Sequence, residues 1–372
     1  MSLVLGIDAR LANAPQRAGV GNFCRGMLDA LPTVAGDTTL RLYLDTEPGA
    51  DLPRGRRCEV RVLPRKRFWT HRVLGPELRR DPPDVFWSPV LQLPLGAPCP
   101  MVATVHDLAV RRFPDQFTLR RRLLARAETR LAVLRAAHLC ADSAATKADL
   151  AHYYRVASER MTVTHAGVAP EFHVPQHAAD IQRVREIHAL PGRFLLYVGR
   201  IQPRKNLERL IEAFEMLCAR VPDLPHHLLM AGDRGWMEGP IHARAERSPV
   251  RGRIRFLGHV PAGDLPPLMA AADALALVSL WEGFGLPVVE AMACGTAVIA
   301  SNCSSLPEVA GDAAVLVDPL DPESMALAIG RVLTDDAARH ALERRGMAQA
   351  AGFTWQAAAA RLMQAVRAAA GR

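Results

Sequence analysis

The sequence has no run of about 18 uncharged apolar residues, the length that a membrane-spanning helix requires. Its seven cysteines are scattered and form no C-x-x-C pair, which favours reduced thiols in a cytoplasmic protein over disulfides or structural zinc. It also has no low-complexity tract, and 49% of its residues are hydrophobic, as in a folded globular chain. The apolar run at 3–7 ends at Asp8, which is typical of a first strand and not of a signal peptide.

Several catalytic signatures are absent as well. No G-x-x-x-x-G-K-[ST] occurs, which excludes a P-loop NTPase, and no G-x-S-x-G occurs to supply the nucleophile of an α/β-hydrolase. No D-x-D, H-E-x-x-H or cluster with the spacing of metal ligands is present either. We therefore expect chemistry without a metal or a resident cofactor.

Short apolar runs alternate with amphipathic stretches along the whole chain of 372 residues, which is too long for one ordinary core. Strands are expected at 3–9, 39–44, 59–63, 85–87, 101–105, 138–141 and 161–164, and then at 194–199, 227–231, 254–257, 275–279, 297–301 and 314–317. A polar stretch at 167–177 interrupts the alternation. The pattern predicts an α/β protein with two doubly wound, Rossmann-like domains facing a central cleft, 1–170 and 171–354.

Apolar periodicity predicts helices at 20–31, 119–137, 144–154 and 355–372. In the helix at 119–137, one face is expected to point inward, with arginines between its members, which are Leu123, Leu124, Ala127, Leu131 and Leu134. Another helix is expected directly after Asn206, whose side chain is a good N-cap.

The stretch at 275–300 reads as a strand, a turn, a short helix and a second strand. Pro287 suits the first helical position and Gly295 the left-handed residue after the helix. Glu282 is then in the turn and Glu290 in the first helical turn, beyond the carboxyl end of a strand, where open α/β sheets bind ligands. A carboxylate near a helix N-terminus also stabilises the helix without having any function. Glu290, however, lies among apolar residues, where it is costly to bury an unpaired carboxylate.

Other polar groups follow predicted strands. Arg200 and Lys205 could clamp a diphosphate, although an ordinary solvated basic loop is the better interpretation of this stretch alone. Gly19 and Gly21 open a helix after the first strand, where glycines let backbone amides approach a phosphate, or simply form a flexible turn. His106 follows the strand at 101–105, and either bonds to a ligand or has a structural role.

Taken together, these segments closely resemble the family 4 retaining glycosyltransferases over nearly the whole chain. The resemblance lies in GIDAR (6–10), GVGNF (19–23), VHDL (105–108), GRIQPRKN (199–206), the E-x7-E from Glu282 to Glu290, and SLPEVAGDAAVLVDP (305–319). It implies a GT-B fold, with an acceptor-binding N-terminal domain and a donor-binding C-terminal domain. It also implies that the helix at 355–372 returns to the first domain.

The resemblance also implies roles for single residues. Arg200 and Lys205 are expected to bind the donor diphosphate, Glu282 and His106 to face the transferred sugar, and Glu290 to bind the ribose. The remaining donor contacts that it implies are Gly19, Gly21, Val260, Phe284, Gly285 and Leu286. At the nucleobase position, GHV at 258–260 replaces the more usual Gly-Tyr-Val, and GVGNF departs from the commoner G-I-G-R-Y.

The implied reaction is glycosyl transfer with retention, in which the acceptor attacks from the face that the phosphate leaves, and the two domains close on the donor. This variant of the motifs is most similar to bacterial mannosyltransferases of surface-polysaccharide assembly, so we expect GDP-mannose as the donor and a saccharide acceptor, often lipid-linked. A UDP-sugar transferase of the same family and a GT-B sugar-nucleotide epimerase are the nearest alternatives. A non-enzymatic protein that binds nucleic acid or membranes would leave the E-x7-E unexplained.

The positive charge belongs to the first half of the chain. Residues 1–180 hold 25 Lys/Arg and 18 Asp/Glu, a net charge of +7, whereas residues 181–372 hold 21 and 20, a net charge of +1. The basic stretch at 65–72, which includes Phe68 and Trp69, together with Arg120–Arg122, could dock on an anionic membrane as a peripheral protein. A solvated arginine-rich surface explains the same residues. We expect no nucleic-acid partner.

Overall fold

The computed structural model describes residues 3–14, 19–50 and 52–371. The chain divides into two compact units. Unit 1 contains the residues up to Gly167 and those from Thr354 onwards, and unit 2 is Val168–Phe353. The division lies within a few residues of the predicted boundaries.

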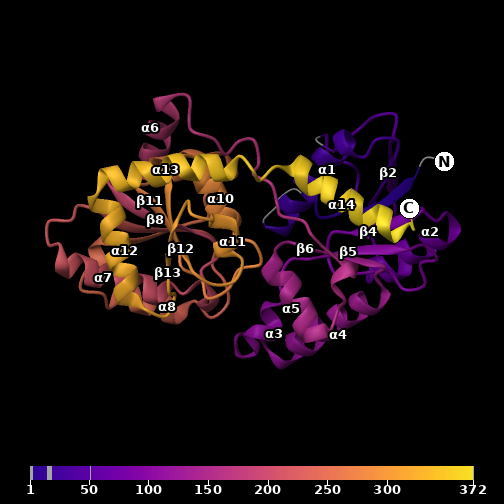
Figure 1. Cartoon of the computed structure of the whole chain (residues 1–372), viewed down its shortest axis with the longest axis horizontal. Coiled ribbons are helices and arrows are strands. Elements are labelled where there is room, and N and C mark those ends of the chain that lie inside the picture. The colour runs from indigo at the N-terminus through magenta and orange to yellow at the C-terminus, as the bar shows by residue number, and fades with distance from the viewer. Residues whose placement is uncertain (1–2, 15–18, 51, 372) are drawn as a thin grey trace. The chain divides into compact units, whose positions relative to one another are not determined.

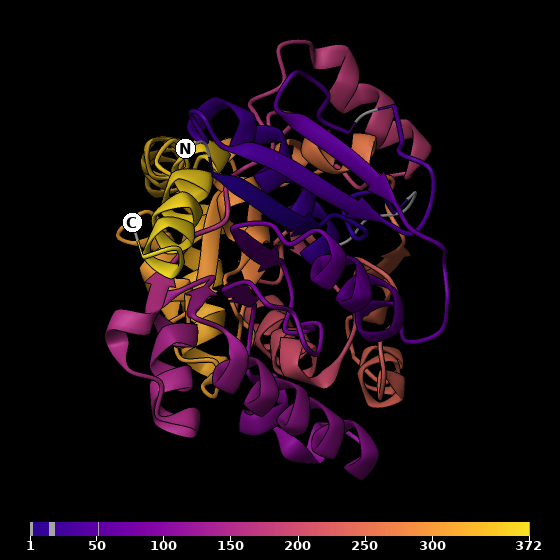
Figure 2. The same cartoon turned by 90° about the vertical axis from the view of Figure 1, so that its right-hand side faces the viewer.

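Unit 1 is built on a parallel sheet that has seven strands among the described residues, in the order β3-β2-β1-β4-β5-β6-β7. The strands are β1 (Val4–Asp8), β2 (Thr39–Leu44), β3 (Cys58–Val62), β4 (Val85–Ser88), β5 (Met101–Val105), β6 (His138–Ala141) and β7 (Met161–Val163). In Figure 2 the indigo strands of this sheet run side by side. The chain returns across the sheet between β1 and β4, so this is the switch point of unit 1.

The helices of unit 1 are α1 (Val20–Val34), α2 (Gly75–Arg80), α3 (Ala109–Arg112), α4 (Leu119–Arg135), α5 (Ala144–Tyr154) and α14 (Trp355–Ala369). Helix α14 lies beside α1, although the two are far apart in the sequence (Figure 1). The ring of Trp355 meets that of Phe23 edge-on, with centroids 5.8 Å apart. The last helix therefore belongs to the first unit.

Unit 2 repeats the plan with a six-stranded parallel sheet in its described residues, in the order β10-β9-β8-β11-β12-β13. Its strands are β8 (Phe194–Val198), β9 (His227–Ala231), β10 (Ile254–Gly258), β11 (Ala274–Leu277), β12 (Ala297–Ser301) and β13 (Val315–Val317). Its helices are α6 (Ala178–Ile187), α7 (Leu207–Arg220), α8 (Gly239–Glu246), α9 (Leu265–Ala271), α10 (Leu286–Ala293), α11 (Leu306–Ala310), α12 (Pro322–Thr334) and α13 (Asp336–Ala350). The predicted fold class, two Rossmann-like α/β domains, is confirmed.

The central strands are buried along their whole length. Every residue of β8, β11 and β12 is buried, because helices cover both faces of a parallel sheet. This is why these strands read as continuous apolar runs and not as an alternation of apolar and polar residues. No helix of the described chain has both the length and the hydropathy that crossing a bilayer requires.

The prediction for the helix at 119–137 was wrong in one respect. Helix α4 forms there, but its buried residues are Thr129, Ala132 and Val133. The leucines that were expected to face the core are exposed. Periodicity identified residues that share a face, and the packing of unit 1 turned this face outward.

Candidate active site

The candidate site lies at the switch point of unit 2, between β8 and β11. Arg200 follows β8, and the short 3-10 turn Pro203–Lys205 comes next. Glu282 follows β11, which pairs directly with β8. Ligands of open α/β sheets bind beyond the carboxyl ends of strands at such a point. The fold therefore brings together groups that lie far apart in the sequence.

Lys205 and Glu282 form one buried ion pair. The ammonium Nζ of Lys205 lies 2.6 Å from Oε1 of Glu282, and the hydroxyl of Ser279 donates to the same oxygen at 2.6 Å. The guanidinium of Arg204 is 3.6 Å from Oε2. Burial opposes ionisation of Glu282, but Lys205, Arg204 and the Ser279 hydroxyl outweigh it and lower the pKa of this carboxyl. Glu282 is therefore an ionised acceptor held in a fixed position.

Serines at the end of the neighbouring strand β12 and just after it fix the loop that carries Glu282. The backbone N–H of Glu282 donates to Oγ of Ser304, and the hydroxyl of Ser305 donates to the carbonyls of Glu282 and Phe284. The hydroxyl of Ser301 donates to the carbonyl of Ser279. The sequence did not predict a role for these serines, although the serine-rich segment SNCSS at 301–305 lies at the end of a buried strand.

Helix α10 begins at the end of this loop. Gly285 precedes it with φ 102°, a conformation that favours glycine, and Leu286 is its first residue. The ring of buried Phe284 packs edge-on against Phe353, with centroids 5.7 Å apart. The first amides of a helix lack intrahelical acceptors and favour an anion. Phe284, Gly285 and Leu286, which the resemblance implies as donor contacts, therefore lie at the start of α10, and their contacts with a donor stay a prediction.

Glu290 is not in the first turn of this helix, as predicted, but in the second. The helix begins at Leu286, one residue before Pro287, and its first turn contains no acidic residue. The side chain is half-buried, and burial, together with the nearby carboxylate of Glu171, raises its pKa to about 8. Glu290 therefore differs sharply from Glu282 in its charge at neutral pH. Gly295 has φ 76° after the helix, as expected.

The remaining predicted groups of unit 2 lie around this site. Arg200 is exposed, and its carbonyl accepts a hydrogen bond of 2.9 Å from the hydroxyl of Tyr197. Val260 is buried just after β10. Asn206 precedes α7 but does not cap it with its side chain, contrary to the prediction. Its amide instead donates to the carbonyls of Val278 and Pro319, so it ties the Lys205 turn to the end of β11.

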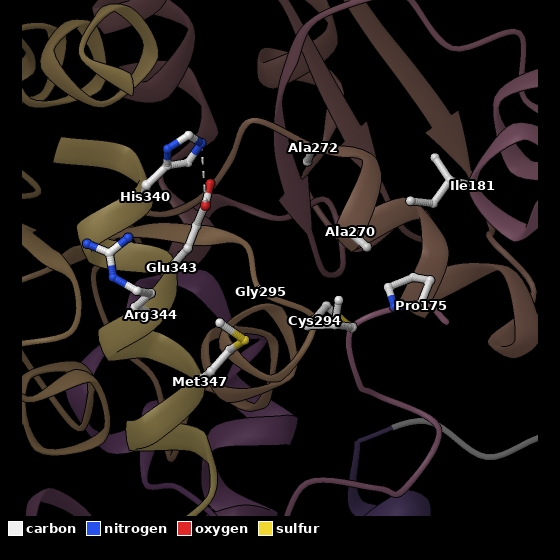
Figure 3. A pocket seen from close by; sticks show the side chains of 11 residues that line it. Pro175, Ile181, Ala270, Ala272, Cys294, Gly295, His340, Glu343, Arg344 and Met347 are labelled. Carbon is white, nitrogen blue, oxygen red and sulfur yellow. Dashed lines mark ion pairs between the residues drawn. The ribbon is translucent and has the colours of Figure 1, made fainter. Parts of the chain in front are cut away.

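A separate hollow of about 410 Å³ lies at the other end of α10 (Figure 3). Cys294 and Gly295, which follow α10, line it together with Ala272, which precedes β11, and Met347 of α13. His340 and Glu343 of α13, whose side chains approach to 4.0 Å, also border it. The hollow is at the amino-terminal edge of the sheet and is distinct from the candidate site.

In unit 1, His106 follows β5 and has both ring nitrogens engaged. Nδ1 lies 2.6 Å from a carboxylate oxygen of Asp142, and Nε2 lies 2.8 Å from the carbonyl oxygen of Pro89. Both partners are acceptors, so the ring makes both hydrogen bonds at once only when both nitrogens carry hydrogen, as they do in an imidazolium. Burial opposes this charge, but Asp142 and the Pro89 carbonyl outweigh it and raise the pKa of His106.

Asp142 orients the ring of His106. The carboxylate of the neighbouring Asp107 accepts a hydrogen bond of 3.0 Å from the backbone N–H of Ala109.

Gly19 has φ 41° and caps α1, and Gly21 is buried in the first turn of that helix. The predicted contacts of His106, Gly19 and Gly21 with a donor stay predictions.

Unit 1 has a second charged cluster at the end of β1. The guanidinium of Arg10 pairs with both carboxylate oxygens of Asp8, at 2.9 and 2.8 Å, and lies 4.1 Å from the centre of the Trp69 ring.

Among the described residues, no three His, Cys, Asp or Glu side chains gather as ligands of a metal ion would.

Two family models match this chain, one in each unit. Residues 19–172 match "Glycosyltransferase Family 4", and residues 180–349 match "Glycosyl transferases group 1". The chain is 32% identical to the O-antigen chain mannosyltransferase B of Escherichia coli over 256 residues, which are 68% of this chain and 67% of that protein. It is 33% identical over 223 residues to the serotype-specific mannosyltransferase WbdA of Escherichia coli, or 59% of this chain and 27% of that longer protein.

Solved structures share the fold across almost the whole chain. A sucrose-phosphate synthase from Thermosynechococcus elongatus has a TM-score of 0.75 at 22% identity, covering 97% of this chain and 98% of that one. Anabaena HepE in complex with UDP and glucose has a TM-score of 0.72 at 20% identity, covering 98% and 99%. With matching family models in both units and a relative that spans two thirds of each chain, this protein belongs to the glycosyltransferases of GT-B fold.

Proposed function

We propose that this protein transfers mannose from GDP-mannose to a saccharide acceptor in the synthesis of a surface polysaccharide. The observation that carries the proposal is the buried Lys205–Glu282 pair beside the start of α10, at the switch point of unit 2. Two relatives that are named as O-antigen or serotype-specific mannosyltransferases support mannose as the sugar.

The donor diphosphate would lie against the first amides of α10, where the helix dipole favours negative charge. Arg200, whose side chain is exposed, and Lys205 would supply the cations. Lys205 is already neutralised by Glu282 in the free protein, so Arg200 would add the larger net positive charge to the bound diphosphate. Glu282, as an ionised acceptor, suits the hydroxyl groups of a hexose, and Glu290 suits those of the ribose.

The proposed reaction breaks the bond between the anomeric carbon and the diphosphate oxygen and forms a bond from that carbon to an acceptor oxygen. The acceptor proton passes to the departing diphosphate. Attack from the face that the diphosphate leaves keeps the anomeric configuration. The cations and the helix start would stabilise the charge that develops on the diphosphate, so we propose that transfer needs no divalent metal. Activity that survives EDTA treatment supports this part, and activity that returns only with added Mg²⁺ or Mn²⁺ contradicts it.

A donor panel tests the proposal. The purified protein is titrated in a calorimeter with GDP-mannose, UDP-glucose, UDP-GlcNAc and UDP-galactose, and the slow release of nucleoside diphosphate is measured for each. We expect binding and release with GDP-mannose. Binding and release with UDP sugars alone would contradict GDP-mannose as the donor but not the transferase activity. No binding or release with any sugar nucleotide would contradict both the donor and the transferase activity.

We further propose that the acceptor is lipid-linked, a proposal supported by a relative that is named for the O-antigen chain. Lipid extracts and their water-soluble delipidated counterparts are offered as acceptors with labelled donor. Transfer of label into the organic phase supports this acceptor class, and transfer only to soluble saccharides contradicts it.

A further inference from the structure

The outward face of helix α4 is apolar. Leu119, Leu123, Leu124, Leu131 and Leu134 are all exposed, from 37% for Leu131 to 72% for Leu134. Spacings of three, four and seven residues place them in adjoining rows along one side of a helix of 17 residues. Helices α3, α4 and α5 lie together along one border of unit 1 (Figure 1). Monomeric proteins seldom expose so many large apolar side chains side by side.

The same helix is strongly basic. Its sequence, LRRRLLARAETRLAVLR, contains six arginines and one glutamate, a net charge of +5 (6 − 1). Arg120, Arg121 and Arg130 are exposed beside the leucines. Within the described part of the chain, no carboxylate forms an ion pair with any of these three. Their charge is therefore available to an external partner.

These two properties together select the kind of partner. A second copy of this helix would bring its own arginines, and like charges would repel. An anionic bilayer accepts leucines into the acyl boundary while arginines reach the phosphates of the headgroups. Basic residues near such a surface are attracted by its negative charge. We infer that the outer face of α4 docks this protein on an anionic lipid surface, and this inference does not depend on the donor or the acceptor.

The basic stretch at 65–72 is a less suitable surface. Trp69 is buried beneath Arg10, so it cannot enter a membrane in this conformation. Phe68 is exposed, but its ring lies between Arg67 and Arg72, with guanidinium carbons 4.9 and 5.5 Å from its centroid. Of the two basic segments that the sequence indicated, 65–72 and Arg120–Arg122, the structure favours the second, which lies in α4.

Co-sedimentation of the full chain with vesicles tests the inference. Phosphatidylcholine vesicles with and without phosphatidylglycerol are compared at low and high salt. We expect binding to the anionic vesicles that high salt weakens. Leu123→Gln with Leu134→Gln, and separately Arg120→Gln with Arg130→Gln, should each lower the partition coefficient by about tenfold or more.

Three controls make the result decisive. Leu320→Gln with Leu327→Gln removes two exposed leucines from unit 2 and should leave binding unchanged. Arg65→Gln with Arg67→Gln tests the competing basic stretch and should have the smaller effect. All variants alter exposed side chains and should keep the melting temperature and the donor hydrolysis of the wild type. Equal binding to neutral and anionic vesicles, no binding, or α4 variants that bind like wild type would overturn the inference, as would dimers that the leucine variants abolish.

Discussion

The ammonium of Lys205 lies 2.6 Å from the carboxylate of Glu282, and the two side chains are almost fully shielded from water. The loops that carry them follow neighbouring strands, β8 and β11. The pair therefore connects two loops of the candidate site and holds Glu282 ionised. Its loss should affect both stability and chemistry.

We predict that Lys205→Met lowers the free energy of unfolding by about 3 kcal/mol, because it leaves a buried carboxylate without its partner. The double variant Lys205→Met/Glu282→Gln should recover part of this loss. Arg220→Met is the matched control, because Arg220 and Glu323 also approach to 2.6 Å but are exposed, and its effect should stay below about 1 kcal/mol. Urea unfolding measures the free energy of unfolding of the three variants. An equal decrease for Lys205→Met and Arg220→Met would contradict the stabilising role of the buried pair.

The pair also predicts a dependence on pH. The pKa of Glu282 is lowered in the folded protein, so its stabilising contribution is present above the unfolded value of 4.5 and is lost as pH falls through the folded pKa. The stability difference between wild type and Glu282→Gln should therefore shrink in acid. A difference that grows in acid would show that the carboxylate is not stabilised by its cations.

Glu290 predicts the opposite dependence. Its pKa is raised from 4.5 to about 8, so the folded state holds a proton that the unfolded state has lost, and its contribution to stability falls as pH rises through this window. If ribose hydroxyls donate to this group, binding of a nucleoside diphosphate releases the proton, and affinity rises with pH up to about 8. Calorimetry in buffers of different ionisation enthalpy should detect the release for wild type but not for Glu290→Gln. The same heat for both proteins in every buffer would contradict this role.

His106 should titrate unlike a second buried histidine of unit 1. Burial alone would lower the pKa of His106, but Asp142 outweighs burial and the pKa is raised. For His138, burial acts together with Arg160 and Lys147, and all three lower the pKa. NMR titration of the imidazole nitrogens should show His106 doubly protonated at a pH where His138 is neutral. Asp142→Asn should lower the pKa of His106 and leave that of His138 in place. The stabilising contribution of His106 is present below 6.5 and is lost as pH rises through its folded pKa. A neutral His106 at pH 6 would refute the assigned hydrogen bonds.

Gly26 should tolerate no larger residue. A Cβ at this position of α1 would overlap the indole of Trp355, which packs on it from α14. We predict that Gly26→Ala destabilises unit 1 by about 2 kcal/mol despite the better helix propensity of alanine. Gly252→Ala, where a Cβ would meet nothing within 4 Å, is the control. Thermal unfolding should show that Gly26→Ala with Trp355→Leu costs less than the sum of the two changes, and additive costs would contradict the packing.

The sequence predicted the strands well because buried parallel strands are continuous apolar runs. The bounds expected for β2, β5, β6, β9 and β12 are those that the structure has. The outward direction of the leucines of α4 could not be predicted, since periodicity does not say which face meets the core. Asp142 and Ser304 were missed because their partners, His106 and Glu282, lie at distant positions that only the fold brings close.

The central claim is that unit 2 binds a sugar nucleotide whose hexose this enzyme transfers. The most direct measurement is mass spectrometry of candidate lipid-linked acceptors after incubation with GDP-mannose, for wild type and for Glu282→Gln. The account predicts that wild type adds one hexose to an acceptor and releases GDP, and that Glu282→Gln does so at least tenfold more slowly. Undiminished transfer by Glu282→Gln, or no added hexose with GDP-mannose and with UDP sugars alike, would contradict it.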